Sequence, residues 1–444
     1  MSRLSIIRRA PARSIVLALS LTAAANLHAA ALHAETTAFT GATVHPVTGP
    51  SIAGATVVVT DGKIAAVGVG VTPPAGAKVV SCAGKHIYPG LISANTVLGL
   101  IEVSSVLGTN DQNETGTVNP NIRAEVGVNP ESEIIPVTRA NGVTMAVIAP
   151  GGGAIAGSAA ALTLDGWTWE DMTLRAPVGM VIYWPQMTIN RAPWEQRSEE
   201  EQKKSRDKAL NDLRNAFKDA RAYLKAKNSE GQGNTPRHDV DVRWEAMAPV
   251  LERKIPALIV AAEVQQIEAA VAWAGQENIR MVLVSGGEAC RVAGLLKGRD
   301  IPVILGPIQT LPERSWEAYD MPFEAPKKLY EAGVKFCITG DRDASNTRNL
   351  PYHAATAAAY GLPKDEALKA VTLYPAQILG LDDRIGSLEI GKDATFIVTN
   401  GDPLEVVTNV EREFICGKDI PLTSKHTRLY EKYREKYRRI SGKN

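Results

Sequence analysis

The sequence predicts an α/β protein with a TIM-like (β/α)8 barrel and a small β-sandwich domain built from both ends of the chain. Two patterns support this prediction. In the middle of the chain, apolar strand-like runs alternate with helical stretches, which is typical of a parallel sheet with right-handed crossovers. Towards each end, short β-rich runs are separated by turn residues. The 444 residues, 45% of them hydrophobic and 22% charged, can bury a large core and do not resemble a disordered or fibrous chain.

The first element, residues 1–34, has the layout of a secretory signal peptide. Four arginines lie within the first 13 residues, an apolar run follows from Ser14 to Leu27, and small residues at Ala29–Ala31 close it. The apolar run is short for a membrane span, which needs about 20 residues. We therefore expect a periplasmic or secreted protein whose mature N-terminus lies between Ala29 and Thr36.

The sandwich is predicted from residues 35–88 and 386–422. Two β-rich runs, Thr56–Thr60 and Lys63–Val67, flank an Asp61-Gly62 pair, which is a strong hairpin signal. The second region also alternates and is punctuated by glycine. Neither region alone can bury two faces, so we expect both to form one composite domain.

The barrel is predicted from residues 89–385. A stretch at Ala161–Asp165 is a candidate eighth strand, and eight strands would close a barrel. An open doubly wound sheet is the alternative. The seven clear strand-like runs are Leu91–Leu98, Met145–Ala149, Met180–Trp184, Ala257–Ala262, Met281–Ser285, Pro302–Gly306 and Lys335–Gly340.

Two further helices lie outside this pattern. Residues 198–227 form a charged insertion with apolar residues at helical spacing, which predicts an amphipathic, solvent-facing outer helix. Residues 423–444 form a basic, aromatic C-terminal helix. It could contact a membrane, but its interspersed Glu431 and Glu435 favour packing against the domain.

Several functional classes are disfavoured. The net charge of +1 provides no field for nucleic acid. The glycine-rich run Gly151–Ser158 lacks the lysine of a phosphate-binding loop, so it predicts a tight turn, with a lid as the alternative.

The four cysteines are widely spaced. Cys82 and Cys416 could form a disulfide in an oxidising compartment, or remain separate thiols.

Short motifs at both ends of the barrel region resemble the amidohydrolase superfamily, in particular its imidazolonepropionase-like branch. This resemblance implies a barrel with a composite sandwich, one or two divalent metals at the C-terminal barrel face, and hydrolysis of amide or related bonds. The motifs are Pro89-Gly90-Leu91-Ile92, Ala367–Leu373, Pro375-Ala376, Gly386-Ser387-Leu388, Ile390-Gly391-Lys392 and Gly401-Asp402-Pro403-Leu404.

The resemblance also implies where metal ligands would stand. Asn95 and Val97 occupy the two histidine positions of the first strand, residues 259–262 of the fifth strand offer no histidine, and Ser285 stands at the histidine position of the sixth. Asp341 matches the aspartate that ends the eighth strand. Only this one ligand of the usual set is therefore present.

The histidine count agrees with this reading. Of seven histidines, only His238 and His353 fall within the barrel region, and neither has a second histidine at ligand spacing. Zn²⁺ prefers nitrogen and sulfur donors, so we expect no bound transition metal and no other cofactor. The alternative is Ca²⁺ or Mg²⁺ held weakly by Asp341, Glu263 and the Asp111–Glu114 loop.

The candidate site is expected where loops follow the barrel strands, because those loops form the functional face of such barrels. Asp341 is the candidate catalytic residue. Turn and capping chemistry is the alternative role for most of the other polar residues. The predicted ligand-pocket residues are Asn95, Glu102, Asp111, Glu114, Glu263, Ser285 and Arg342.

Two functions remain open from the sequence. In the first, the protein is non-catalytic and binds a small amide- or peptide-like ligand, or serves as the partner subunit of an active amidohydrolase paralogue in a homo- or hetero-oligomer. In the second, it hydrolyses C–N bonds of amides, cyclic amides or peptides with an unusual metal site. The missing histidines favour the first, because a metal-activated water requires the metal.

Overall fold

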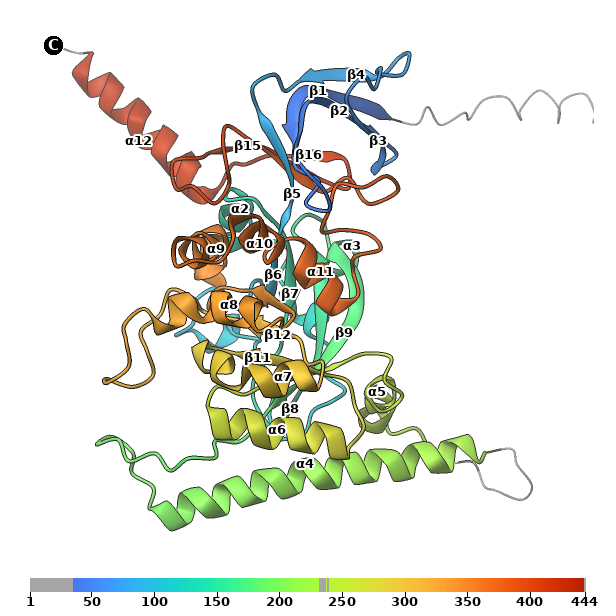
Figure 1. The fold of residues 1–444 in the computed structure, drawn as a ribbon, viewed down its shortest axis with the longest axis vertical. Helices are drawn as coiled ribbons and strands as arrows, with labels where there is room; N and C mark the ends of the chain where they lie inside the picture. Colours follow the sequence, from blue (N-terminus) through green and yellow to red (C-terminus); the bar gives the residue numbers. More distant parts are fainter. Residues whose placement is uncertain (1–34, 231–236, 238, 443–444) are drawn as a thin grey trace, which may run out of the picture.

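A computed structural model of the chain describes residues 35–230, 237 and 239–442. The predicted signal peptide and His238 lie outside the described residues. Two eight-stranded sheets dominate the structure. Figure 1 shows the sheet that contains β1 to β5 at one end, the barrel with its helices in the middle, and a long helix, α4, across the opposite end. No helix among the described residues is long and apolar enough to cross a membrane.

The first sheet combines strands from both ends of the chain in the order β16-β15-β14-β5-β1-β2-β3, with β4 on β1. Antiparallel pairing of β5 with β14 joins the two regions, and β2 and β3 form the predicted hairpin. Phe39 packs against Phe396 and Phe414 in its core, with ring centroids 5.1 and 4.7 Å away. The strands are β1 (Thr36–Val44), β2 (Ile52–Thr60), β3 (Lys63–Gly68), β4 (Lys78–Ser81), β5 (His86–Pro89), β14 (Phe396–Thr399), β15 (Val410–Ile415) and β16 (Lys418–Ile420).

The second sheet is the predicted barrel, in the order β13-β12-β11-β10-β9-β8-β7-β6. It is nearly closed, because the Thr339 hydroxyl donates to the Asn95 carbonyl at 3.3 Å across the seam. The barrel prediction is confirmed, and the open doubly wound sheet is excluded. The strands are β6 (Leu91–Thr96), β7 (Val143–Ile148), β8 (Ile155–Thr163), β9 (Thr173–Tyr183), β10 (Ala257–Val260), β11 (Met281–Ser285), β12 (Val303–Leu305) and β13 (Phe336–Ile338).

The barrel departs from eight parallel strands at β8. This strand lies antiparallel to both β7 and β9, whereas the other neighbouring pairs are parallel. Only the Ala149–Ala154 turn separates β7 from β8, and a parallel crossover needs a dozen or more residues. The glycine-rich run therefore supplies both a tight turn, as expected, and the first residues of β8, which begins before the candidate run Ala161–Asp165.

The barrel interior is a packed apolar core. Alternate residues of the strands, among them Ile92, Leu258 and Ile304, face inward, and α11 (Leu373–Leu379) closes the N-terminal floor with Ile378 and Leu379. The other alternate residues face outward against the helices. These helices and turns are α2 (Ile134–Arg139), α3 (Trp169–Met172), α4 (Glu199–Asn228), α5 (Val242–Leu251), α6 (Val264–Gln276), α7 (Ala293–Gly298), α8 (Met321–Glu331), α9 (Leu350–Ala359), α10 (Lys364–Lys369), η1 (Leu107–Thr109), η2 (Ala124–Gly127), η3 (Gly287–Val292) and η4 (Ala344–Asn349).

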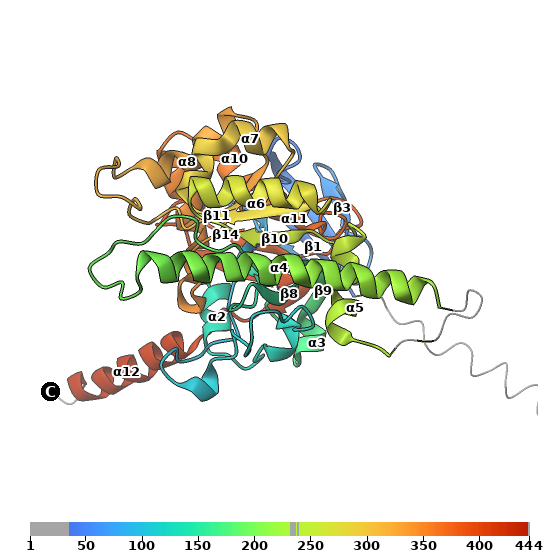
Figure 2. The same ribbon diagram turned by 90° about the horizontal axis from the view of Figure 1, so that it is seen from below.

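The two extra helices behave differently. Helix α4 begins with a capping box between Ser198 and Glu201 and buries one face, where the Phe217 ring lies 4.8 Å from that of Trp273. The C-terminal helix, α12 (Lys425–Ser441), has no buried residue and extends away from the body in both views (Figures 1 and 2). The expectation that α12 packs against the domain is wrong, because an amphipathic pattern does not specify what covers the apolar side.

Candidate functional site

The C-terminal mouth of the barrel is where the parallel strands β6, β7, β9, β10, β11, β12 and β13 end. Its inner wall is mostly apolar, with the half-buried side chains of Tyr183, Val260 and Val284 at the rim of the interior cluster. The side chain of Arg342, just after β13, reaches to the end of β7. The mouth thus combines an apolar wall with one cation.

Arg342 is held in place by neutral partners. Its Nη2 donates to the Ala149 carbonyl at 2.5 Å, and its Nη1 donates to the Gln112 side chain at 3.2 Å. The Nε is buried and has no hydrogen-bond partner. Burial lowers the pKa of Arg342, and the nearby Tyr183 hydroxyl opposes this shift without any carboxylate contributing.

A glycine provides the space beside this guanidinium. A Cβ on Gly151 would lie 3.2 Å from both terminal nitrogens of Arg342 and 2.4 Å from the Asn113 side-chain oxygen. A larger residue would therefore collide with the loop that carries Gln112 and Asn113. The glycine-rich turn thus lets the loop after β6 approach Arg342.

Asp341 lies beside a buried histidine. Its carboxylate accepts the Asp343 backbone N–H at 3.1 Å and the Asn346 amide at 2.8 Å. His353, on α9, accepts two backbone N–H groups at Nδ1, from Ile308 at 3.3 Å and Gln309 at 3.1 Å. A neutral His353 therefore carries its proton on Nε2. Burial lowers the pKa of His353, and the negative charge of Asp341 opposes that shift.

The first-strand and sixth-strand candidates do not present side chains together at the mouth. Val97 is 2% exposed and belongs to the outer apolar layer, where its N–H donates to the Arg342 carbonyl at 3.1 Å. Asn95 contributes its backbone carbonyl to the barrel seam. Ser285 is buried with an unpartnered hydroxyl, and strand alternation places it on the outward face with Leu283.

The acidic candidates are dispersed. Glu263 precedes α6 and accepts hydrogen bonds from Thr188 at 2.5 Å and Gln186 at 3.3 Å. Glu102 accepts a long hydrogen bond, of 3.5 Å, from the Asn129 side-chain amide. Asp111 and Glu114 are exposed and line a cavity of about 450 Å³ beside Pro150. The structure therefore brings the 111–114 loop towards Arg342, but leaves Glu102, Glu263 and Ser285 elsewhere.

Three mouth residues were not predicted from the sequence. Tyr183 lies one residue before the end of the predicted run Met180–Trp184, and Gln112 lies within the predicted Asp111–Glu114 loop. His353 is not predicted as a site residue, because no second histidine lies at metal-ligand spacing from it. The rule that functional residues follow barrel strands could have identified Tyr183; only the fold places His353 beside Asp341.

The donor set does not fit the divalent metal that the resemblance implies. The inward side chains at the ends of β10 and β11 are Val260 and Val284, which have no donor atoms. Within the described ranges, no three His, Cys, Asp or Glu side chains come together as a possible metal site. The buried guanidinium of Arg342 would also repel a cation bound at the mouth.

All four cysteines are free thiols. Cys82 is buried, whereas Cys416 is exposed. Cys337 lies inside the barrel core, where complete burial raises its thiol pKa and opposes formation of a thiolate. The structure therefore contains neither the Cys82–Cys416 disulfide nor an activated thiol at the mouth.

Comparison with known proteins agrees with the fold. The model of the amidohydrolase family matches residues 320–417. Among curated proteins, the amidohydrolase tasK of Hapsidospora irregularis is 24% identical over 353 residues, which cover 75% of this chain and 36% of that protein. An imidazolonepropionase of Syntrophobacter fumaroxidans is 32% identical over 78 residues, 17% of this chain and 18% of the relative. The chain thus matches about a third or less of these relatives' lengths.

Solved structures extend the similarity over most of the chain. An amidohydrolase from Thermotoga maritima MSB8 has a TM-score of 0.78 and 29% identity, covering 87% of this chain and 99% of that one. A prolidase complexed with N-methylphosphonate-L-proline has a TM-score of 0.53 and 16% identity, covering 87% and 99%, and supports the fold alone. Taken with the barrel, the composite sheet and the motifs at their junctions, these matches show that the chain belongs to the amidohydrolase superfamily.

Proposed function

We propose that this protein binds a small amide- or peptide-like ligand carrying a carboxylate at the barrel mouth, and that it does not perform metal-assisted hydrolysis. The observation that carries the proposal is the partly buried guanidinium of Arg342, which has no carboxylate partner among the residues that the structure describes. A buried charge is costly unless it is paired. A ligand carboxylate would supply the missing partner.

The geometry of Arg342 suits such a ligand. A guanidinium has five N–H donors. The two hydrogen bonds of Arg342 use two of them, so three N–H donors remain, including the buried Nε–H. Arginine binds carboxylates in a bidentate manner. Val260 and Val284 provide an apolar wall for an uncharged side chain of the ligand.

Calorimetric titration with N-acetyl-leucine and N-acetyl-leucinamide tests the proposal, because the two probes differ at the carboxylate. We expect the acid to bind and Arg342→Gln to weaken it by about 10- to 100-fold, as expected for hydrogen bonds to a charged group. Arg348→Gln, at an exposed arginine of the same segment, is the matched control. Equal binding of the amide, or unchanged binding by Arg342→Gln, contradicts the proposal.

A second candidate function is hydrolysis of a C–N bond, favoured by the proximity of Asp341 to His353. A carboxylate beside a histidine is a common arrangement for general acid–base chemistry. Metal analysis and an amide-hydrolysis assay separate the two candidates. Stoichiometric transition metal, together with hydrolysis that Asp341→Asn abolishes, would establish the hydrolase and reject the non-catalytic proposal.

We also propose that the protein is exported, on the basis of its N-terminal sequence. Cleavage of a signal peptide should leave a mature N-terminus between Ala29 and Thr36. N-terminal sequencing of the protein from the periplasm or the medium measures this directly. An exported chain that still begins at Met1 would contradict this proposal.

A further inference from the structure

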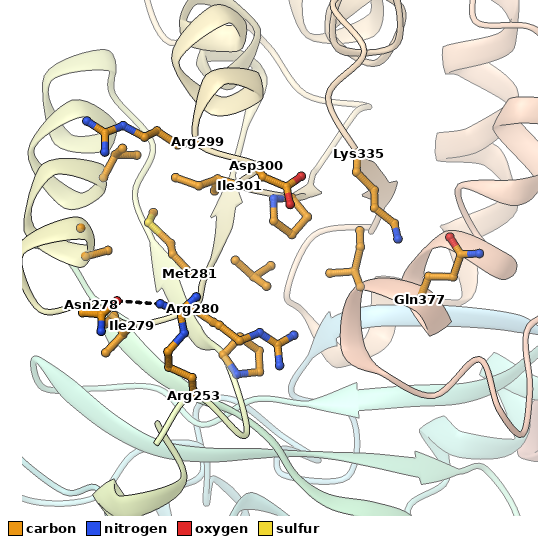
Figure 3. A pocket seen from close by; sticks show the side chains of 17 residues that line it. Arg253, Asn278, Ile279, Arg280, Met281, Arg299, Asp300, Ile301, Lys335 and Gln377 are labelled. Carbon is orange, nitrogen blue, oxygen red and sulfur yellow. Dashed lines mark hydrogen bonds between the residues drawn. The ribbon is translucent and has the colours of Figure 1, made fainter. Parts of the chain in front are cut away.

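A second cavity, of about 520 Å³, opens at the opposite end of the barrel from the mouth. Figure 3 shows its side chains, which come from the loops that precede β10, β11, β12 and β13, from the start of β11, and from α6 and α11. These loops lie at the N-terminal floor of the barrel. The volume is within the usual range for pockets that bind small molecules.

Four cations from four different loops line this floor cavity. They are Arg253, Arg280, Arg299 and Lys335, and the only carboxylate in the lining is that of Asp300. The Arg253 guanidinium donates to the Asn278 side chain at 2.7 Å, as drawn in Figure 3. The Arg280 guanidinium donates to the Lys254 carbonyl at 3.5 Å.

These cations lack acidic partners. Throughout the described chain, no ion pair within 4.0 Å involves any of the four, whereas the neighbouring Lys254 pairs with Glu252 at 2.7 Å. Like charges that line one cavity raise its electrostatic potential and attract anions. Pairing with an anion would relieve the repulsion among them.

Interaction with the C-terminal ends of helices does not explain why all four cations lie where they do. Arg299 immediately follows α7 and can interact with its terminal carbonyls. Arg280 and Lys335, however, lie four residues beyond the ends of α6 and α8, and each directly precedes a strand. The helix dipole acts mainly within the last turn, so these two residues are free for another role.

The remainder of the lining is largely apolar. Val271, Ala274, Ile279 and Ile301 form part of it, beside Ile378 of α11. These apolar side chains are themselves at most 8% exposed, and a single inorganic ion would fill only a small part of a cavity of about 520 Å³. A ligand with both anionic groups and a carbon skeleton complements the cavity better.

We propose that the floor cavity is a second binding site, for an organic anion with two or more negative charges of the phosphate or carboxylate class. Arg280 and Lys335 hold its charged groups, and the apolar wall contacts its skeleton. The site is independent of the ligand proposed for the mouth, because the packed barrel core separates the two ends.

Calorimetric titration of the full chain with pyrophosphate and with citrate tests this site, in chloride buffers of matched ionic strength. We expect saturable binding of at least one of them, one ion per chain, and the tighter probe identifies the anion class. Arg280→Gln and Lys335→Gln should each weaken binding at least about 10-fold, since each removes a charge-assisted contact. Arg280→Lys should restore part of the affinity.

Two control variants make the result specific. Arg214→Gln, on the exposed side of α4, should bind as the wild type does. Arg342→Gln should also leave this binding unchanged, although it is expected to weaken binding at the mouth by about 10- to 100-fold. If Arg280→Gln fails to fold, Lys335→Gln on a different loop provides the same comparison. The absence of saturable binding of both probes, or affinities unchanged by both substitutions, would overturn the proposal.

Discussion

Arg342 and Glu413 are both ionisable residues in buried surroundings, where burial lowers the pKa of Arg342 and raises the pKa of Glu413. An arginine keeps its charge in proteins, which is why we propose that Arg342 pairs with the carboxylate of a ligand. Glu413 lies in β15 opposite Ile397 and Ile420, and within the described part of the chain neither of its carboxylate oxygens has a hydrogen-bond partner. Burial raises the pKa of Glu413 well above 4.5; Arg139 opposes the shift and Asp165 adds to it.

This raised pKa predicts a specific pH dependence of stability. The folded chain keeps the Glu413 proton at pH values where the unfolded chain has lost it, so Glu413 lowers stability as pH rises above 4.5, towards its folded pKa. Within that window the loss is about 1.4 kcal/mol per pH unit. Glu413→Gln cannot release a proton and should remove this loss.

Thermal unfolding at pH 5 and pH 8 measures the effect. The gain in melting temperature from Glu413→Gln should be larger at pH 8 than at pH 5. Glu411→Gln is the matched control in the same strand, because Glu411 is partly exposed and pairs with Lys85 at the surface. Such pairs contribute little. An equal gain at both pH values would show that Glu413 is already ionised in the folded chain.

At the scale of elements, β8 shows why strand direction escapes a sequence pattern. All nine residues from Ile155 to Thr163 are buried. A strand buried on both faces is apolar throughout, whether it runs parallel or antiparallel to its neighbours. Its direction is decided by the length of the Ala149–Ala154 turn, which is too short for a crossover.

Helix α12 provides an element-scale prediction. None of its residues is buried, and an exposed ion pair between Arg428 and Glu133, at 2.8 Å, links it to the body. Such a pair contributes at most about 1 kcal/mol. A chain that ends at Ser424 should therefore melt within about 2 °C of the full chain in differential scanning calorimetry. A much larger loss would mean that α12 is covered by protein in solution.

At the scale of the whole molecule, the composite sheet ties the two ends of the chain together. A fragment of residues 35–380 lacks β14, β15 and β16, which leaves the edge of β5 unpaired and removes Phe396 and Phe414 from the ring of Phe39. Exposed apolar faces and unpaired strand edges promote aggregation.

We expect this fragment to be insoluble or to melt well below the full chain. Solubility after expression and the melting temperature of any soluble fraction measure this, and the chain that ends at Ser424 serves as the control because it keeps the complete sheet. A soluble 35–380 fragment with an unchanged melting temperature would show that the N-terminal strands are stable without their C-terminal partners.

The sequence by itself determined the architecture. Alternating apolar runs and helices predicted the barrel, the Asp61-Gly62 pair predicted the β2–β3 hairpin, and helical periodicity predicted α4. These features could be predicted because they depend on spacing along the chain: a period of two or 3.6 residues, or a turn between strands. Arg342 was selected for a related reason, since it lies in the loop that follows a barrel strand.

The tertiary structure decided which of these side chains share a site. Arg342 meets Ala149, Gln112 and Tyr183, which lie far from it in sequence, and Asp341 lies near His353 rather than near Glu263. The floor cavity likewise gathers cations from four separate loops. Closure of the barrel sets these distances. The direction of β8 depends on the length of the turn before it, and the exposure of α12 depends on which surfaces are available for it to pack against. None of these quantities is encoded in the local periodicity of the chain.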